Sequence, residues 1–203
     1  MARKMNKYPV TKSDPICKWR NASIDTVVEL VSLLPKTRMP SDLFRSHMIP
    51  YYGGAFFRTP YQLALQLALY YEDEDVFIPR FDHNITRDEA LKYMHKWITK
   101  YYVPNPFTKR GFINIEPSII LLYGLMDYLE DHPTKPNLAT AGAALFGGEM
   151  GNIGCVKFIL NEYSNLIEVD DNFDMRLLLN RSGNITVPFK RDDKKAFFEH
   201  FNS

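Results

Sequence analysis

The residues best suited to a chemical role are basic side chains in the middle of the chain. Lys92, Lys96 and Lys100 recur at every fourth position, so they share one face if this segment is a helix. Lys109 and Arg110 follow, and no acidic residue lies between Lys92 and Arg110. Concentrated basic side chains bind phosphates, although lysines on one face of an amphipathic helix are also typical of an ordinary solvent-facing surface. We interpret the segment as a phosphate-contacting surface, with the ordinary solvent-facing surface as the alternative.

The last third of the chain supplies a second group of basic and amide side chains. Small residues over 138–146 predict a short helix, Gly147 and Gly148 predict a turn, and apolar spacing over 152–163 predicts a second helix. Two helices joined by a glycine turn are typical of a helix-turn-helix, whose second helix reads bases in the major groove. Three polar side chains of the second helix are therefore base-reading candidates: Asn152, Lys157 and Asn161.

Alternating apolar residues after the second helix predict a β-hairpin. The predicted strands cover residues 166–169, 175–179 and, after a turn at Ser182 and Gly183, 185–189. A helix-turn-helix followed by a hairpin is the order of a winged helix, a fold that serves both as a DNA-binding and as a protein-interaction module. The hairpin region carries four basic residues as candidate phosphate contacts: Arg176, Arg181, Lys190 and Arg191.

Further helices must hold these segments in place. Thr86 and Glu89 have the spacing of a capping box and open the helix that carries the three lysines. The acidic run over 72–75 is expected at a solvated helix end or in a loop. Apolar spacing, N-cap residues and prolines predict helices over 23–34, 41–48, 60–70, 86–101 and 117–130, and a last helix over 193–201.

These elements predict an α+β protein that is mainly α-helical, with a helical N-terminal portion and a C-terminal winged-helix-like segment. Basic residues outnumber the single acid Asp14 at the N-terminus, and prolines there favour an extended chain, so we interpret residues 1–22 as a basic extended arm. An ordinary solvated terminus is the alternative. The predicted division continues with a helical domain over 23–132 and a winged-helix-like subdomain with a C-terminal helix over 133–203.

The motifs that would define an enzyme are missing from the sequence. It has no glycine-rich phosphate loop, no nucleophile elbow and no zinc-protease helix motif, and its histidines are isolated. Cys17 and Cys155 fit no metal-ligand spacing. The nearest approach to a nuclease metal site, Asp174 with Asp193 and Lys195, puts the lysine at a helix start instead of on a strand beside the acid. We therefore expect no cofactor and no metal, and we favour a function other than catalysis.

Overall charge and hydropathy restrict the class of partner. The formal net charge is +1, so any electrostatic attraction has to come from local patches. The N-terminus lacks the apolar core of a signal peptide, and no apolar run is long enough to span a bilayer. Two separated cysteines agree with a reducing compartment. We expect a cytoplasmic protein without a membrane partner, and the oligomeric state stays open.

Two stretches of the sequence are similar to a known family. The segment KWITKYYVPNPFTKRGFINIEPSIILLYGLMDYL resembles the recognition region of AlwI-class type IIS restriction endonucleases in Trp97, in the Pro-Asn-Pro break over 104–106 and in Ile-Glu-Pro over 115–117. The end of the chain, LLLNRSGNITVPFKRDDKKAFFEHF, is similar to the hairpin that closes their winged-helix subdomain. The resemblance implies a DNA-recognition module. The family's PD-(D/E)xK catalytic motif is missing, so the resemblance does not extend to nuclease activity.

The sequence as a whole predicts a recognition module that binds double-stranded DNA, in a restriction-modification system or in a phage or bacterial regulatory system. Basic side chains of the arm, the lysine face and the hairpin would hold phosphates, and the second helix would read bases. The main alternative is a non-catalytic protein–protein interaction module of a phage or its host. An unrecognised enzyme is the third.

Overall fold

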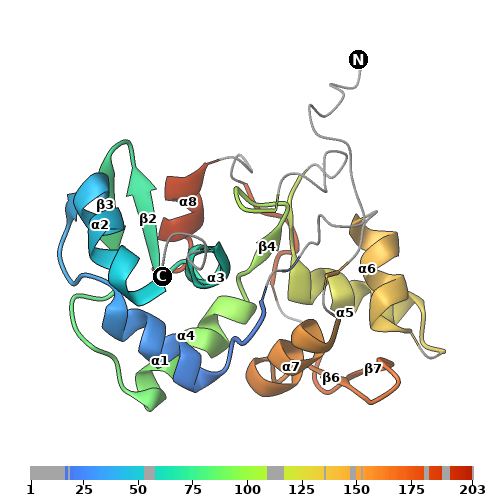
Figure 1. The fold of residues 1–203 in the computed structure, drawn as a ribbon. Coiled ribbons are helices and arrows are strands. Elements are labelled where there is room, and N and C mark those ends of the chain that lie inside the picture. The colour runs from blue at the N-terminus through green and yellow to red at the C-terminus, as the bar shows by residue number, and fades with distance from the viewer. Residues whose placement is uncertain are drawn as a thin grey trace, which may run out of the picture.

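The structure is a computed structural model that describes residues 17, 19–52, 58–108, 117–134, 136–146, 150–151, 153–180, 183–188 and 193–202. These residues form helices and short antiparallel strands, which confirms the predicted α+β class (Figure 1). The helices are α1 (Ile24–Leu33), α2 (Ser41–Tyr52), α3 (Arg58–Gln66), α4 (Arg87–Ile98), α5 (Leu121–Asp131), α6 (Leu138–Phe146), α7 (Ile153–Tyr163) and α8 (Lys194–Glu199). The strands are β1 (Met39–Pro40), β2 (Tyr70–Asp73), β3 (Val76–Pro79), β4 (Tyr102–Val103), β5 (Ile119–Ile120), β6 (Ile167–Val169) and β7 (Met175–Leu177).

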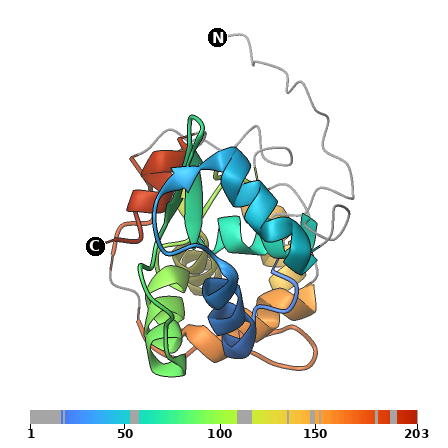
Figure 2. The same cartoon turned by 60° about the vertical axis from the view of Figure 1, so that its left-hand side comes forward.

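The C-terminal helices and the last hairpin lie on one side of the molecule. Figure 1 places α5, α6, α7 and the β6–β7 hairpin on the right, and α2, β2, β3 and α8 on the left. Figure 2, turned by 60°, brings α1 to the front, between α4 and α7. None of the helices in the described part of the chain has the length and apolar character needed to cross a membrane.

A three-stranded sheet in the order β1-β3-β2 was not predicted, and its strand β2 overlaps the end of a predicted helix. The helix expected over 60–70 ends at Gln66, and Tyr70 already begins β2. The acidic run over 72–75 therefore closes a hairpin, with Glu74 in the left-handed region at φ 53°. A short apolar run such as Leu67–Tyr71 fits a helix and a strand equally well, so the local pattern could not reveal the strand.

Two other helix boundaries differ from the prediction. Helix α2 was expected to end before Pro50 but continues to Tyr52 with the proline inside it. Helix α5 was expected to begin at Pro117 but begins at Leu121, because the two preceding residues form β5 and pair with β4. This pairing is between residues that are distant in the sequence, and helical spacing carries no information about it.

The C-terminal third has the predicted α6, α7 and β6–β7 hairpin, and it contains a pairing that the sequence did not predict. The segment just before α6 runs antiparallel to the start of β7 through a bridge between Asn137 and Asp174. The amide of Met175 donates to the carbonyl of Pro136 at 3.0 Å, and the amide of Leu138 donates to the carbonyl of Phe173 at 2.8 Å. The chain order is therefore α5, a short paired segment, α6, α7, β6 and β7.

The third strand expected over 185–189 does not join this hairpin in the residues that the structure describes. Thr186 instead forms an antiparallel bridge with Ile119 of β5. The amide of Ile120 donates to the carbonyl of Ile185 at 2.8 Å, and the amide of Val187 donates to the carbonyl of Ser118 at 3.0 Å. The segment predicted as a third strand therefore lies beside β5, which offers it an unpaired edge, and not beside the β6–β7 hairpin.

Helix α4 packs against elements on both of its sides, and the candidate residues lie around it. Its Trp97 is fully buried, donates from Nε1 to the carbonyl of Gln66 at 3.0 Å and packs edge-on against Trp19. Helices α1 and α7 pack on α4, and α8 packs on β2. The predicted capping box at the N-terminus of α4 is confirmed. The Thr86 side chain accepts from the amide of Glu89, and the Glu89 carboxylate accepts from the amide of Thr86.

Candidate nucleic-acid interface

Helix α7 is held against the core through one face and leaves another face exposed. Val156, Ile159 and Leu160 are fully buried, as their spacing predicts. The hydroxyl of Tyr163 donates to the carbonyl of Ala22 at 2.8 Å, which ties the end of α7 to the segment before α1. On the exposed face, Phe158 keeps 40% of its surface in contact with solvent. This face is available to a partner.

Two of the predicted base readers instead hold the β6–β7 hairpin. The amide of Asn161 donates to the carbonyl of Val169 at 2.8 Å, and its Oδ1 accepts from the Val169 amide at 2.7 Å. The ammonium of Lys157 lies 2.6 Å from a carboxylate oxygen of Asp171, and this contact lowers the pKa of Asp171. Both side chains therefore fix the hairpin to α7, and their polar groups have partners within the chain.

The described hairpin arginine is also paired. Arg176 lies directly across the β6–β7 ladder from Glu168, and its Nε lies 3.0 Å from Glu168 Oε2. Both side chains are at least half exposed. Such exposed ion pairs contribute little to stability.

The predicted lysine face of α4 lies beside the carboxyl end of α8. Lys96 Nζ donates to the carbonyl of Asn202 at 3.1 Å, and Lys100 Nζ donates to the carbonyl of His200 at 3.4 Å. Burial, and then the neighbouring Lys96, lower the pKa of Lys100, and burial lowers the pKa of His200. Lys92, one turn earlier, is exposed. Cations are favourable at a helix C-terminus, so two of the three lysines stabilise the docking of α8.

The structure thus divides the described candidates between two places. His95 Nδ1 lies 2.7 Å from the carbonyl of Tyr163 at the end of α7, whereas the next residue, Lys96, contacts the end of α8. The lysine face and the α7–hairpin unit therefore lie on different sides of α4. Six further candidates lie outside the described residues and stay predictions: Lys109, Arg110, Asn152, Arg181, Lys190 and Arg191.

A surface pocket of about 510 Å³ beside α7 was not foreseen. It lies between residues 19–26 and the first two turns of α7, because Cys17 pairs with Gly151 just before that helix. The sequence gives one hint of this pocket, because Phe158 falls outside the buried spacing of α7. The opposite wall of the pocket comes from residues 19–26, which are far from α7 in the sequence. The lining residues are Trp19, Asn21, Ala22, Ser23, Thr26, Gly154, Cys155 and Phe158.

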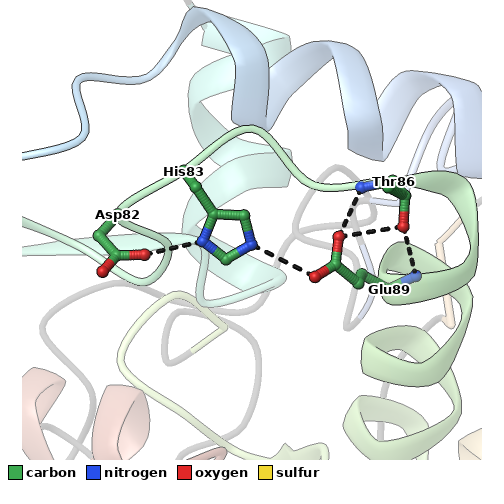
Figure 3. Close-up of polar contacts among 4 residues, drawn as sticks. All are labelled: Asp82, His83, Thr86 and Glu89. Carbon is green, nitrogen blue, oxygen red and sulfur yellow. Dashed lines mark hydrogen bonds and ion pairs between the residues drawn. The ribbon is translucent and has the colours of Figure 1, made fainter.

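A polar cluster marks the opposite, amino-terminal end of α4. Figure 3 shows the imidazole of His83 between two carboxylates, with Nδ1 2.7 Å from Asp82 and Nε2 3.3 Å from Glu89. The second oxygen of Glu89 accepts from the amide and hydroxyl of Thr86. These contacts raise the pKa of His83, with Asp82 as the largest cause. The cluster fastens the β3–α4 loop to the capping box.

No side-chain cluster suited to a metal ion occurs in the part of the chain that the structure describes, where groups of three or more histidine, cysteine or acidic residues were sought. Burial raises the pKa of the Cys17 thiol and so favours its protonated form. Comparison of the chain with protein-family models, with curated proteins and with solved structures gave no match. A proposal of function for this chain therefore rests on the contacts of α4, α7 and the hairpin.

Proposed function

We propose that this chain binds double-stranded DNA through a winged-helix unit formed by α5, α6, α7 and the β6–β7 hairpin. The observation that carries the proposal is the pairing of residues 136–138 with the start of β7. A winged helix runs helix, strand, helix, helix, strand, strand, and its first strand pairs with its last. The order α5, paired segment, α6, α7, β6 and β7 has this connectivity. In such a unit α7 is the helix that enters the major groove.

The charge near this unit supports the choice of nucleic acid as partner. Cys17 pairs with Gly151, just before α7, and in the sequence four basic residues and one acidic residue precede Cys17. The exposed Lys92 and the exposed Arg176 are further phosphate contacts in the proposal. The predicted contacts at Lys109, Arg110, Arg181, Lys190 and Arg191 belong to it on sequence grounds alone. The resemblance to AlwI-class recognition regions favours the same function.

Within this proposal Lys157 and Asn161 have a different role from the one expected at first. Their polar groups bind Asp171 and Val169 of the hairpin region, so they set the angle between α7 and the wing. Base reading then falls to other side chains of the exposed face of α7. Asn152, at the start of that helix in the sequence, stays a base-reading prediction.

The test is the affinity of the protein for a random-sequence duplex of about 20 base pairs, measured by fluorescence anisotropy at about 50 and 200 mM salt. A protein that neutralises several phosphates should lose affinity by at least ten-fold, and commonly about 10³-fold, over that range. Lys92→Gln should weaken binding, whereas Arg38→Gln, an equal loss of charge beside β1, serves as the matched control. Absence of binding at the lower salt concentration would contradict the proposal.

A protein-interaction module is the second candidate, and one observation favours it. Leu178 and Leu179, directly after β7, are 46% and 58% exposed. Adjacent exposed leucines are typical of a surface that another protein covers. Under this alternative, the double variant Leu178→Ser, Leu179→Ser should lose a protein that co-purifies with the wild type from its native host. The DNA proposal predicts that the same variant keeps its affinity for duplex DNA.

A further inference from the structure

We propose that the outward side of α2, together with the tip of the β2–β3 hairpin, docks an amphipathic helix of another protein that is rich in lysine or arginine. The docking surface, which we call the α2 face, consists of residues 38–51 and 72–76. Figure 1 places it on the left, away from α7 and the β6–β7 hairpin. The inference goes beyond the proposed DNA-binding function and does not rest on it.

Helix α2 exposes large apolar side chains on the side where a surface helix ordinarily carries polar ones. Leu43, Ile49 and Tyr51 are 57%, 58% and 51% exposed. The buried side of the helix is formed by Phe44 and Met48, so the three exposed residues are not needed for the core. Large apolar side chains gathered on one exposed side of a helix are typical of a surface that another molecule covers.

The exposed residues of α2 include a row that suits a second helix. Leu43, His47 and Tyr51 recur at every fourth position, and such rows form the ridges that pack into the grooves of a neighbouring helix. The ring centres of His47 and Tyr51 lie 5.6 Å apart, and a ring nitrogen of His47 lies 3.2 Å from the carbonyl of Leu33. The row is about 12 Å long, which corresponds to about two turns of a partner helix.

The remainder of the α2 face is acidic. The amide of Ser41 donates to the carbonyl of Asp75 at 2.8 Å, and Nη2 of Arg45 lies 2.8 Å from Glu72, so the hairpin lies beside the first two turns of α2. Besides Arg45, the face carries one more arginine, Arg38. Carboxylates outnumber these two cations, and they are Asp42, Glu72, Asp73, Glu74 and Asp75.

The chemistry of the occupant follows from the two parts of this face. The apolar side of a partner helix would cover the row from Leu43 to Tyr51, and its lysines or arginines would lie against the acidic hairpin tip. Complementary charge speeds the encounter and fixes the orientation, whereas buried apolar contacts carry most of the affinity. A second copy of the same face would bring two acidic tips together, so like charges disfavour that occupant.

The probe is a synthetic amphipathic peptide of leucine and lysine, about 14 residues long, which forms about four helical turns. Its binding to the full chain is measured by fluorescence anisotropy at about 50 mM salt. A peptide with glutamate in place of every lysine is the matched control. We expect saturable binding of the lysine peptide and at least about ten-fold weaker binding of the glutamate peptide. Raising the salt to about 200 mM should weaken the lysine peptide by about three- to ten-fold.

One variant tests the acidic part of the face. The double variant Glu74→Asn, Asp75→Asn removes two charges from the hairpin tip, and asparagine tolerates the left-handed backbone of Glu74 at φ 53°. It should weaken the lysine peptide by at least about five-fold at low salt. The control Glu130→Gln, Asp131→Asn removes the same charge from exposed positions of α5 and should change the affinity by less than about two-fold.

A second variant tests the apolar part. Leu43→Ser should weaken the lysine peptide by at least about five-fold, because a leucine at the centre of the contact is lost. Leu179→Ser, at a position that is 58% exposed beyond the end of β7, should leave the affinity unchanged and is the matched control. All the substituted positions are exposed, so the variants should fold, and unchanged urea midpoints check this.

The inference is overturned if the lysine peptide does not bind, or if the variants and their controls lose affinity equally, which would indicate unspecific adsorption. A dimer of the chain in sedimentation velocity that Leu43→Ser dissociates would identify a second copy as the occupant and would also overturn it. Any of these results leaves the DNA proposal untouched, because duplex binding is measured separately and is assigned to α7 and the β6–β7 hairpin.

Discussion

Helices α4 and α7 both carry basic or amide residues that the sequence marks as nucleic-acid contacts, but they use them against different neighbours. On α4, Lys96 and Lys100 donate to backbone carbonyls at the end of α8. On α7, Lys157 and Asn161 hold the β6–β7 hairpin through a carboxylate and a backbone peptide group. Helical spacing identifies residues that share a face, but the partner of that face depends on tertiary packing. In each helix a neighbouring residue, Lys92 or Phe158, is left exposed.

The largest effect should come from the α7–hairpin contact. Asn161→Ala removes two hydrogen bonds to Val169, each with a net contribution of about 1 kcal/mol, so the free energy of unfolding should fall by about 2 kcal/mol. Glu162→Ala, at an exposed neighbouring position of α7, should change it by less than about 0.5 kcal/mol and is the matched control. Urea unfolding measures both. Equal effects of the two substitutions would show that Asn161 does not hold the hairpin.

The lysine face of α4 should divide into a structural and a ligand-binding part. The double variant Lys96→Gln, Lys100→Gln removes two cations from the end of α8 and should lower the free energy of unfolding by about 1 kcal/mol. Lys92→Gln should leave stability unchanged and still weaken DNA binding. Urea unfolding and fluorescence anisotropy, applied to both proteins, separate the two roles. Loss of stability in Lys92→Gln would contradict the division.

A smaller effect is expected at the hairpin arginine. Glu168→Gln removes the carboxylate that binds Arg176 and should tighten DNA binding by about two- to five-fold at low salt, because the guanidinium becomes available to phosphate. Stability should change by less than about 0.5 kcal/mol. Anisotropy titrations with the wild type and with Glu168→Gln give the comparison. Unchanged affinity would place Arg176 outside the DNA contact.

The smallest effect belongs to the amino-terminal end of α4. The carboxylates of Asp82 and Glu89 raise the pKa of His83 above its ordinary value of 6.5. Because the folded-state pKa is the higher one, the stabilisation is fully present below pH 6.5 and is lost as the pH rises through the folded-state pKa. His83→Gln should therefore lose stability relative to the wild type only at acidic pH. An NMR titration of the His83 ring that gives a pKa below 6.5 would contradict this.

Local rules in the sequence predicted a good part of the fold. The capping box at Thr86, the start of the last helix near residue 193 and the apolar spacing of α7 are confirmed, because each depends on residues within about one or two turns of each other. The β1-β3-β2 sheet was missed, since Met39 pairs with Phe77 across a long stretch of chain. Such pairing depends on which segments pack together, and no local pattern encodes it.

The candidate site was less accessible to sequence reasoning than the fold. Lys96 and Lys100 were read as a shared face, which is right for a helix, but their partners lie at Asn202 and His200. The pocket joins residues 19–26 to α7 through the Cys17–Gly151 bridge. Both features join distant segments of the chain, so they could be found only once the tertiary structure was known.

The central claim, that the exposed face of α7 contacts duplex DNA, is tested most directly by NMR. Amide chemical shifts of the ¹⁵N-labelled protein are followed while a duplex of about 20 base pairs is added at about 50 mM salt. The account predicts saturable shifts at Gly154, Phe158 and Asn21, with smaller shifts at Lys92. An unchanged spectrum, or shifts confined to the exposed pair Leu178 and Leu179, would contradict it.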